Sequence, residues 1–328
     1  MKKVMRFACL VGVVALALTS CKKNEQTATS FKAATEQFVV ESEDDSRVYV
    51  NANNQIVFEQ NDQVMLFNIG GEVDDAALYY STSTATYVEF RPVQEVGINP
   101  TADAEGAFYA FYPGENVIPA NLRSESRYKF PVAAEQEYRT LNGNVAVPKG
   151  AMYMAAKEAN VKQLGQVNFQ FKNICGLACF KFYSSTPGKT IKRIKVEDKT
   201  FNISGDVELR VDKVDPDEMT SLLNNYNLSN QSYVDQLNDY ISEVGYNVTN
   251  SGRSIVLNLG EGVELTTTKA TAKQFLMVLR PLALKNGCKI YVSEDSTGEN
   301  WILAADSNKD NMIRPNLFRN FAAVKINF

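Results

Sequence analysis

The side chains that most often carry out chemistry in proteins are scarce in this chain of 328 residues. It contains no histidine, which excludes a Ser-His-Asp or Cys-His nucleophile and the histidine-rich zinc sites of hydrolytic metalloenzymes. Carboxylates, lysine and tyrosine remain, but the 38 acidic residues offer many pairs and the sequence selects none of them. We therefore expect no catalytic residues, and a carboxylate-based glycosidase is the weaker alternative.

Motifs for bound cofactors and metals are equally weak. Gly70-Gly71 and Gly260-Glu261-Gly262 lack the helix and the lysine that follow the glycines of a phosphate-binding loop, and hairpin turns explain both. Residues 306–311 supply oxygen ligands without the central glycine and late glutamate of a calcium loop. The sequence therefore predicts no cofactor and no metal site.

One cysteine stands where covalent modification is expected. A basic start is followed by an apolar run from Phe7 to Leu18, and then by Thr19, Ser20 and Cys21. The apolar run is too short to anchor the chain across a bilayer and is typical of a secretory signal. The Leu-Thr-Ser-Cys ending is similar to the bacterial lipoprotein signal, which implies that the Cys21 thiol is acylated. We expect residues 1–20 to be a signal peptide and Cys21 to be the first mature residue, carrying palmitate.

Three further cysteines lie in the mature chain, at positions 175, 179 and 288. In an extended strand Cys175 and Cys179 would lie about 13 Å apart, beyond the reach of a disulfide. We interpret them as small core residues. A bridge from Cys288 to one of them is left open, because an envelope compartment is oxidising.

The charge of the mature chain argues against two classes of partner. Of the 34 basic side chains three lie in the signal peptide, which leaves 31 against 38 acidic ones, a net charge near −7. Such a balance excludes nucleic acid as the expected partner and does not favour electrostatic binding to anionic lipid.

Most of the chain is predicted to form short β-strands. Runs rich in Val, Ile, Phe, Tyr and Thr alternate with Gly, Asn, Asp and Pro, a spacing typical of antiparallel sandwiches or barrels. We expect an all-β protein with a polar tether over 21–35, one domain over 36–166 and a second over 167–328. The expected strands are 55–59, 63–68, 78–81, 86–90, 106–112, 144–147, 167–171, 177–183, 191–197, 206–211, 254–259, 274–279, 289–293, 301–304 and 322–328.

A short helical insertion is expected over about 215–245. Asp215 stands as an N-cap before Pro216, with Glu218 three residues after the cap. A second helix is expected from Ser232 to a stop at Gly245. Aromatic residues elsewhere, such as those of 108–112 and the lone Trp301, are interpreted as core rather than as a ligand platform.

The order and spacing of several segments add a further indication. They are Cys21, 55–68, 108–113, 152–156, 169–182, 274–281 and the terminal 320–328. Together these segments resemble the fimbrillin family, the lipoprotein precursors of type V pili in Gram-negative anaerobes. The resemblance spans nearly the whole mature chain.

The resemblance implies two β-sandwich domains of transthyretin-like topology and assembly by donor-strand exchange at the cell surface. An arginine-specific protease would cut after Arg47, which stands in an acidic segment, and remove Phe38-Val39-Val40. The terminal strand, with Val324, Ile326 and Phe328 on one face, is the candidate donor. Expected partners are other fimbrial subunits in a homo- or hetero-polymer, the outer membrane through the lipid, and a host or bacterial surface ligand. The alternative is a surface glycan-binding lipoprotein that does not polymerise.

Overall fold

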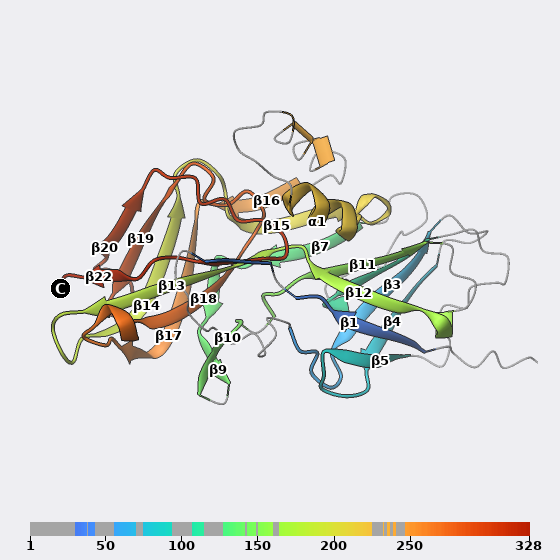
Figure 1. Ribbon diagram of the computed structural model, residues 1–328, viewed down its shortest axis with the longest axis horizontal. Coiled ribbons are helices and arrows are strands. Elements are labelled where there is room, and N and C mark those ends of the chain that lie inside the picture. The colour runs from blue at the N-terminus through green and yellow to red at the C-terminus, as the bar shows by residue number, and fades with distance from the viewer. Residues whose placement is uncertain are drawn as a thin grey trace, which may run out of the picture.

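The computed structural model describes residues 30–37, 39–42, 56–69, 75–93, 107–114, 127–141, 143–148, 150–159, 164–224, 232, 235–236, 239–240 and 247–328. Cys21 and Arg47 lie outside these residues, as do Phe38 and the whole signal peptide. Within the described residues the chain is all-β, which confirms the expected class. A barrel and several sheets lie side by side, with one α-helix near their junction (Figure 1).

Seven strands close into a barrel in the order β1-β12-β11-β6-β3-β4-β5. Its interior holds a cluster of apolar side chains, eight of them aromatic: Phe31, Phe58, Tyr79, Phe90, Phe108, Phe169, Phe171 and, half-buried at its margin, Tyr112. The strands of this region close into a barrel. The transthyretin-like sandwich that the family resemblance implies is not confirmed here and stays a prediction. The barrel strands are β1 (Phe31–Thr35), β3 (Gln63–Ile69), β4 (Asp75–Ser81), β5 (Tyr87–Pro92), β6 (Ala107–Tyr112), β11 (Met154–Ala159) and β12 (Asn168–Asn173).

The strand β6 shows why this barrel adheres to the rest of the molecule. Phe108 and Ala110 face the barrel interior, whereas Tyr109 and Phe111 face a second and larger apolar cluster. An almost continuously apolar strand is expected where both faces of a sheet are covered. The interpretation of these aromatic residues as core is confirmed.

Two larger sheets pack over the second apolar cluster. One has the order β18-β13-β21-β2, with β22 also paired to β13, and the other has the order β20-β19-β14-β17-β8. Their strands are β2 (Val39–Ser42), β8 (Glu135–Glu137), β13 (Gly176–Ser184), β14 (Thr190–Asp198), β17 (Ser254–Glu264), β18 (Lys273–Leu279), β19 (Cys288–Ser293), β20 (Ile302–Ser307), β21 (Leu317–Asn320) and β22 (Val324–Ile326).

Two smaller sheets and short helices complete the fold. One sheet has the order β16-β15-β7 and the other pairs β10 with β9. The elements are β7 (Arg127–Val132), β9 (Arg139–Leu141), β10 (Asn144–Ala146), β15 (Ser204–Arg210), β16 (Asn247–Gly252), the helix α1 (Pro216–Asn224) and the 3₁₀ turns Leu164–Gln166, Val211–Lys213 and Lys269–Thr271.

Strand pairing crosses the expected boundary at residue 166 in both directions. The strand β12 follows this residue but pairs with β1 and β11 in the barrel. The strands β2, β7 and β8 precede it but pair with β21, β15 and β17. The domain limits therefore stay a prediction, and neither half builds its sheets from its own strands alone.

Residues 31–35 differ from the expectation of a polar tether over 21–35, because they form the barrel strand β1. Only Phe31 is a large apolar residue in Phe31-Lys32-Ala33-Ala34-Thr35. The other two buried positions hold Ala33 and Thr35, which give no hydrophobic alternation. The tether expectation is wrong for these five residues.

The first half of the helical insertion begins as expected. The side chain of Asp215 accepts hydrogen bonds from the backbone N–H groups of Asp217 (3.0 Å) and Glu218 (3.1 Å), which is the N-cap arrangement. Of the second expected helix, residues 232, 235–236 and 239–240 are described, and they are helical.

Candidate functional site

The strand β1 is held on both sides within the barrel. It runs parallel to β12, with Ala33 opposite Phe169, and antiparallel to β5, with Ala33 opposite Val88. Phe31, Ala33 and Thr35 point inward, and their exposed fractions are 1%, 0% and 2%. We call the spaces that these three side chains fill the Phe31, Ala33 and Thr35 subsites.

The Phe31 subsite is lined by aromatic rings. The Phe31 ring lies 5.0 Å from that of Tyr79, 5.4 Å from that of Phe90 and 5.1 Å from that of Phe169, measured between centroids. These separations are those of favourable aromatic pairs. Phe31 is therefore the principal apolar anchor of β1.

The end of β1 is fixed by polar contacts. The Thr35 hydroxyl donates a hydrogen bond to the carbonyl of Ile56 (2.6 Å), and the Glu36 N–H donates to the carbonyl of Phe171 (2.8 Å). A β-branched or larger side chain without a hydroxyl would leave the Ile56 carbonyl without this donor. The Thr35 subsite therefore favours a small hydroxyl-bearing residue.

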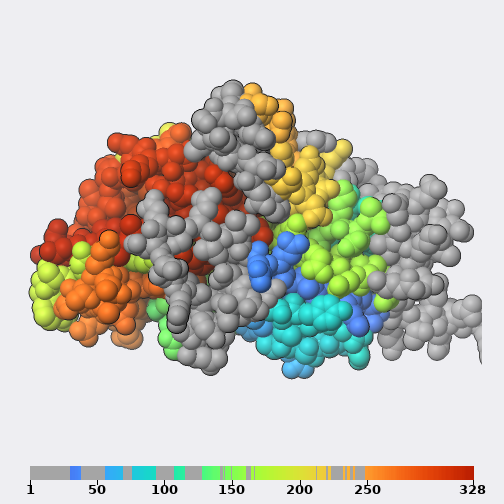
Figure 2. All heavy atoms as spheres, viewed as in Figure 1, coloured from blue at the N-terminus to red at the C-terminus, as the bar shows by residue number. Residues whose placement is uncertain are grey.

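The next strand, β2, lies at the edge of a different sheet. It runs parallel to β21, with Val39 opposite Leu317 and Ser42 opposite Asn320. Just before it, the Asn316 side-chain amide donates a hydrogen bond to the carbonyl of Gln37 (3.0 Å). A single segment, residues 31–42, thus contributes one strand to the barrel and an edge strand to a neighbouring sheet. Figure 2 shows part of this segment, in blue, at the molecular surface.

The C-terminal strand β22 occupies a place in the structure of its own chain. It pairs in parallel with β13, with Val324 opposite Phe182 and Ile326 opposite Ser184. Ile326 is 1% exposed, and Val324 and Phe328 are half-buried. The Lys189 ammonium lies 4.7 Å from the centroid of the Phe328 ring. All three side chains pack in or against the larger apolar cluster, while their shared strand face and their role as a donor strand stay predictions.

The helix α1 is tied to the barrel beside β1 by ion pairs. The Lys172 ammonium of β12 lies 2.5 Å from Asp217 of the helix and 3.5 Å from Glu36, which follows β1. Burial lowers the pKa of Lys172, but the Asp217 hydrogen bond and the Glu36 charge raise it above its usual value. One lysine thus links the helix to the strand segment that the family resemblance implies is removed.

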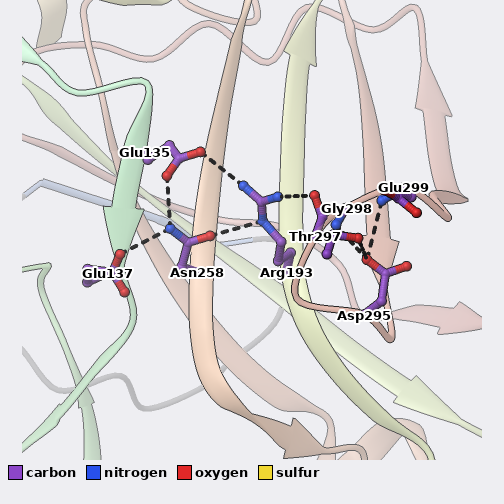
Figure 3. A network of polar contacts seen from close by, with 8 residues as sticks. All are labelled: Glu135, Glu137, Arg193, Asn258, Asp295, Thr297, Gly298 and Glu299. Carbon is purple, nitrogen blue, oxygen red and sulfur yellow. Dashed lines mark hydrogen bonds and ion pairs between the residues drawn. The ribbon is translucent and has the colours of Figure 1, made fainter.

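A polar network lies on one face of the β20-β19-β14-β17-β8 sheet (Figure 3). Arg193 donates hydrogen bonds to Asn258 (3.0 Å), to the Thr297 carbonyl (2.8 Å) and to Glu135 (3.0 Å). Asn258 donates in turn to Glu137 (3.0 Å). Since each nitrogen of the guanidinium has a partner within the protein, the network fastens β8 to the sheet.

Trp301 lies beside this network rather than in either apolar cluster, so its interpretation as core is wrong. It is half-buried, with the Lys195 ammonium 4.7 Å and the Arg193 guanidinium 5.8 Å from its ring. Gly298 packs against the ring so closely that an added Cβ would lie 2.9 Å from it. Lysine and arginine cover an aromatic ring in this way on solvated sheet faces.

The three cysteines of the described residues are free and buried, so the bridge left open for Cys288 is not formed. Burial raises the pKa of the Cys288 thiol to about 11 and that of Cys179 to about 12, and it raises the pKa of Cys175 as well. Thiols react as thiolates. All three therefore behave as core residues at neutral pH.

The described residues hold no group of three or more cysteine or acidic side chains placed to bind a metal. Asp306, from the segment weighed as a calcium loop, is ion-paired with Lys199. Among the same residues, no helix combines the length and apolar character needed to cross a membrane.

Sequence reasoning missed β1, the Lys172 link and the Arg193 network. The alternation in β1 rests on one phenylalanine, and its neighbours in the barrel come from residues 87–92 and 168–173. A signal for β1 was the short Phe-x-Ala-x-Thr pattern, which is too weak to separate a strand from a polar segment.

The chain is similar to several known structures to different degrees. A candidate cell adhesion protein from Bacteroides ovatus matches with a TM-score of 0.50 and 11% identity, over 91% of this chain and 91% of that one. Another candidate cell adhesion protein, from Bacteroides uniformis, has a TM-score of 0.48 and 12% identity over 87% and 90% of the two chains. A fimbrial protein from Bacteroides ovatus has a TM-score of 0.39 and 9% identity, over 92% of this chain and 50% of that one. No protein-family model and no curated protein matches the chain by sequence. At 11% identity, the likeness to the first of these proteins is a likeness of fold.

Proposed function

We propose that this chain is a fimbrial subunit or a fimbria-associated adhesion lipoprotein of the cell surface, assembled by donor-strand exchange and without catalysis. The observation that carries the proposal is that residues 31–42 supply strands to two different sheets. This one segment precedes Arg47 and supplies both β1 of the barrel and the edge strand β2.

Removal of this segment would create two acceptor sites at once. Departure of β1 would leave the facing backbone groups of β5 and β12 without partners and would empty the Phe31, Ala33 and Thr35 subsites. Departure of β2 would expose the edge of β21. An inserted strand gains ladder hydrogen bonds and side-chain burial together, and an open sheet edge promotes such pairing.

Lipid attachment fits the same sequence of events. Acylation of Cys21 would hold the precursor at the outer membrane, and a cut after Arg47 would release the body from its lipid. If Arg47 is retained, the same lipid makes the chain a permanent anchor.

An arginine-specific protease tests the proposal on the purified precursor. We expect a new N-terminus at Val48, followed by SDS-resistant complexes once a partner strand or subunit is added, and neither product from an Arg47→Lys precursor. An Arg91→Lys precursor is the matched control, because Arg91 is an exposed arginine of a barrel strand and its replacement leaves the cut at Arg47 unchanged. Uncut precursor, or cut protein that stays monomeric in the presence of partner strands or subunits, would contradict a stalk role and favour the glycan-binding alternative.

A further inference from the structure

The structure also indicates what kind of strand can replace β1, an inference that rests on the proposed function. We infer that the barrel accepts a strand from a different subunit, one that presents an aromatic residue and then two small residues at alternate positions. The C-terminal strand of a second copy of this chain does not have that pattern.

The requirement for a small second residue comes from the Ala33 subsite. Ala33 is fully buried, and it lies between Phe169 of β12 and Val88 of β5 in the strand register. Phe169 also packs on the Phe31 ring. Additional methylene groups in such a packed interior force neighbouring side chains out of their preferred rotamers. The Ala33 subsite therefore discriminates against valine, isoleucine and larger residues.

The first and third subsites impose different requirements. Three aromatic rings surround Phe31, so a small residue there would leave a cavity. The Thr35 subsite is buried and supplies a carbonyl acceptor, that of Ile56. A charged side chain placed there loses its hydration. A fitting strand therefore has the pattern aromatic, small, small or hydroxyl-bearing.

The C-terminal segment fails this pattern in each register that places Phe321, Ile326 or Phe328 inward. With Val324, Ile326 and Phe328 inward, isoleucine enters the Ala33 subsite whichever way the strand runs. With Phe321, Ala323 and Lys325 inward, the first two subsites are satisfied but lysine enters the Thr35 subsite. With Ala322, Val324 and Ile326 inward, the Phe31 subsite is left largely empty when the strand runs as β1 does, and valine enters the Ala33 subsite in either direction.

The present place of the C-terminal strand agrees with this inference. Ile326 is buried in the larger apolar cluster, and Phe321 stacks on Phe180 of β13 with ring centroids 4.8 Å apart. The strand thus completes a sheet of its own chain. This chain therefore joins a polymer by accepting a strand of a different subunit in the groove that β1 leaves.

The intact chain tests the Ala33 subsite without any cleavage. Ala33→Ile is expected to lower the melting temperature by roughly 3–10 °C. The matched control, Ala34→Ile, places the same side chain on the opposite, half-buried face of β1 and is expected to shift it far less. An Ala33→Ile protein as stable as the native one would overturn the inference, because the subsite would then not select for size.

Peptide exchange on the protease-cut protein tests the partner directly. We expect the peptide of residues 30–37 to bind, the native peptide of residues 320–327 to bind at least about tenfold more weakly, and its Lys325→Thr form to approach the first. Equal binding of the native C-terminal peptide, or no gain from Lys325→Thr, would overturn the inference and leave strand exchange intact. Failure of the 30–37 peptide itself would instead refute the proposed function, and the inference with it.

Discussion

Replacement of Phe31 by alanine measures how strongly β1 is held in the barrel. Phe31 is 1% exposed, and its ring packs on those of Tyr79, Phe90 and Phe169 at centroid distances of 5.0, 5.4 and 5.1 Å. Truncation of a buried phenylalanine costs about 3–5 kcal/mol of unfolding free energy. We expect Phe31→Ala to fall in this range, since each of the three ring pairs adds to the loss.

The same loss appears in the local opening of β1 if the strand leaves while the rest of the barrel stays folded. A loss of about 3 kcal/mol raises the open population by about 100-fold. Urea unfolding followed by circular dichroism gives the global change, and hydrogen exchange of the amides of residues 31–35 gives the local one. Lys32→Ala is the control, because Lys32 is exposed on the opposite face of β1 and its loss is expected to cost less than about 0.5 kcal/mol. A Phe31→Ala effect below about 1 kcal/mol on both measures would refute the assignment of Phe31 as the anchor.

Three further predictions concern the rest of the molecule. Gln136→Leu removes a buried amide that forms hydrogen bonds with both the N–H and the carbonyl of Val278 (3.0 and 2.7 Å). We expect the free energy of unfolding, measured in urea, to fall by about 2 kcal/mol. A fall no greater than that of the exposed Glu137→Gln control would contradict the role of this amide. Cys175, Cys179 and Cys288 are buried, so we expect none of them to react with a thiol reagent in the native protein at pH 7 and all three to react after unfolding. Stoichiometric labelling of these cysteines in the native protein would show that their thiols are accessible. Burial raises the pKa of Asp215, but its hydrogen bonds with Lys157 and with the Glu218 N–H hold that pKa below the usual value. We therefore expect the native protein to have a higher free energy of unfolding than the Lys157→Met variant at pH 6, and this difference to vanish as the pH falls through the Asp215 pKa. A difference in urea midpoint that persists in acid would contradict a stabilising role for this ion pair.

The sequence was sufficient for the elements whose own residues specify them. The strand β6 is apolar on both faces and lies between two apolar clusters, and Asp215 caps α1 as its spacing predicted. The strand β12 also alternates as expected, with Phe169 and Phe171 buried. In each case local pattern and tertiary environment agree.

The remaining features depend on pairing between distant residues. The strand β1 has little apolar alternation and is a strand because β5 and β12 bind it from both sides. The exchange of β2, β7 and β12 across residue 166 follows from topology, which a pattern of short strands does not specify. Trp301 has a large aromatic side chain, but it lies on a sheet face where Lys195 and Arg193 of β14 cover its ring.

The candidate site was predicted from the sequence only in outline. Val39 and Val40 were expected to belong to the removable segment, and they lie in the edge strand β2. The barrel strand within the same segment, and the link from Lys172 to Glu36 and Asp217, became evident only from the packing.

Hydrogen exchange on the precursor before and after the cut at Arg47 tests the central claim most directly. The account predicts that the released protein loses amide protection in β5 and β12, keeps it in β3 and β6, and regains it in β5 and β12 when a partner strand is added. Unchanged protection in β5 and β12 after the cut would show that residues 31–42 are a permanent part of the fold. That result would contradict assembly by strand exchange at the barrel.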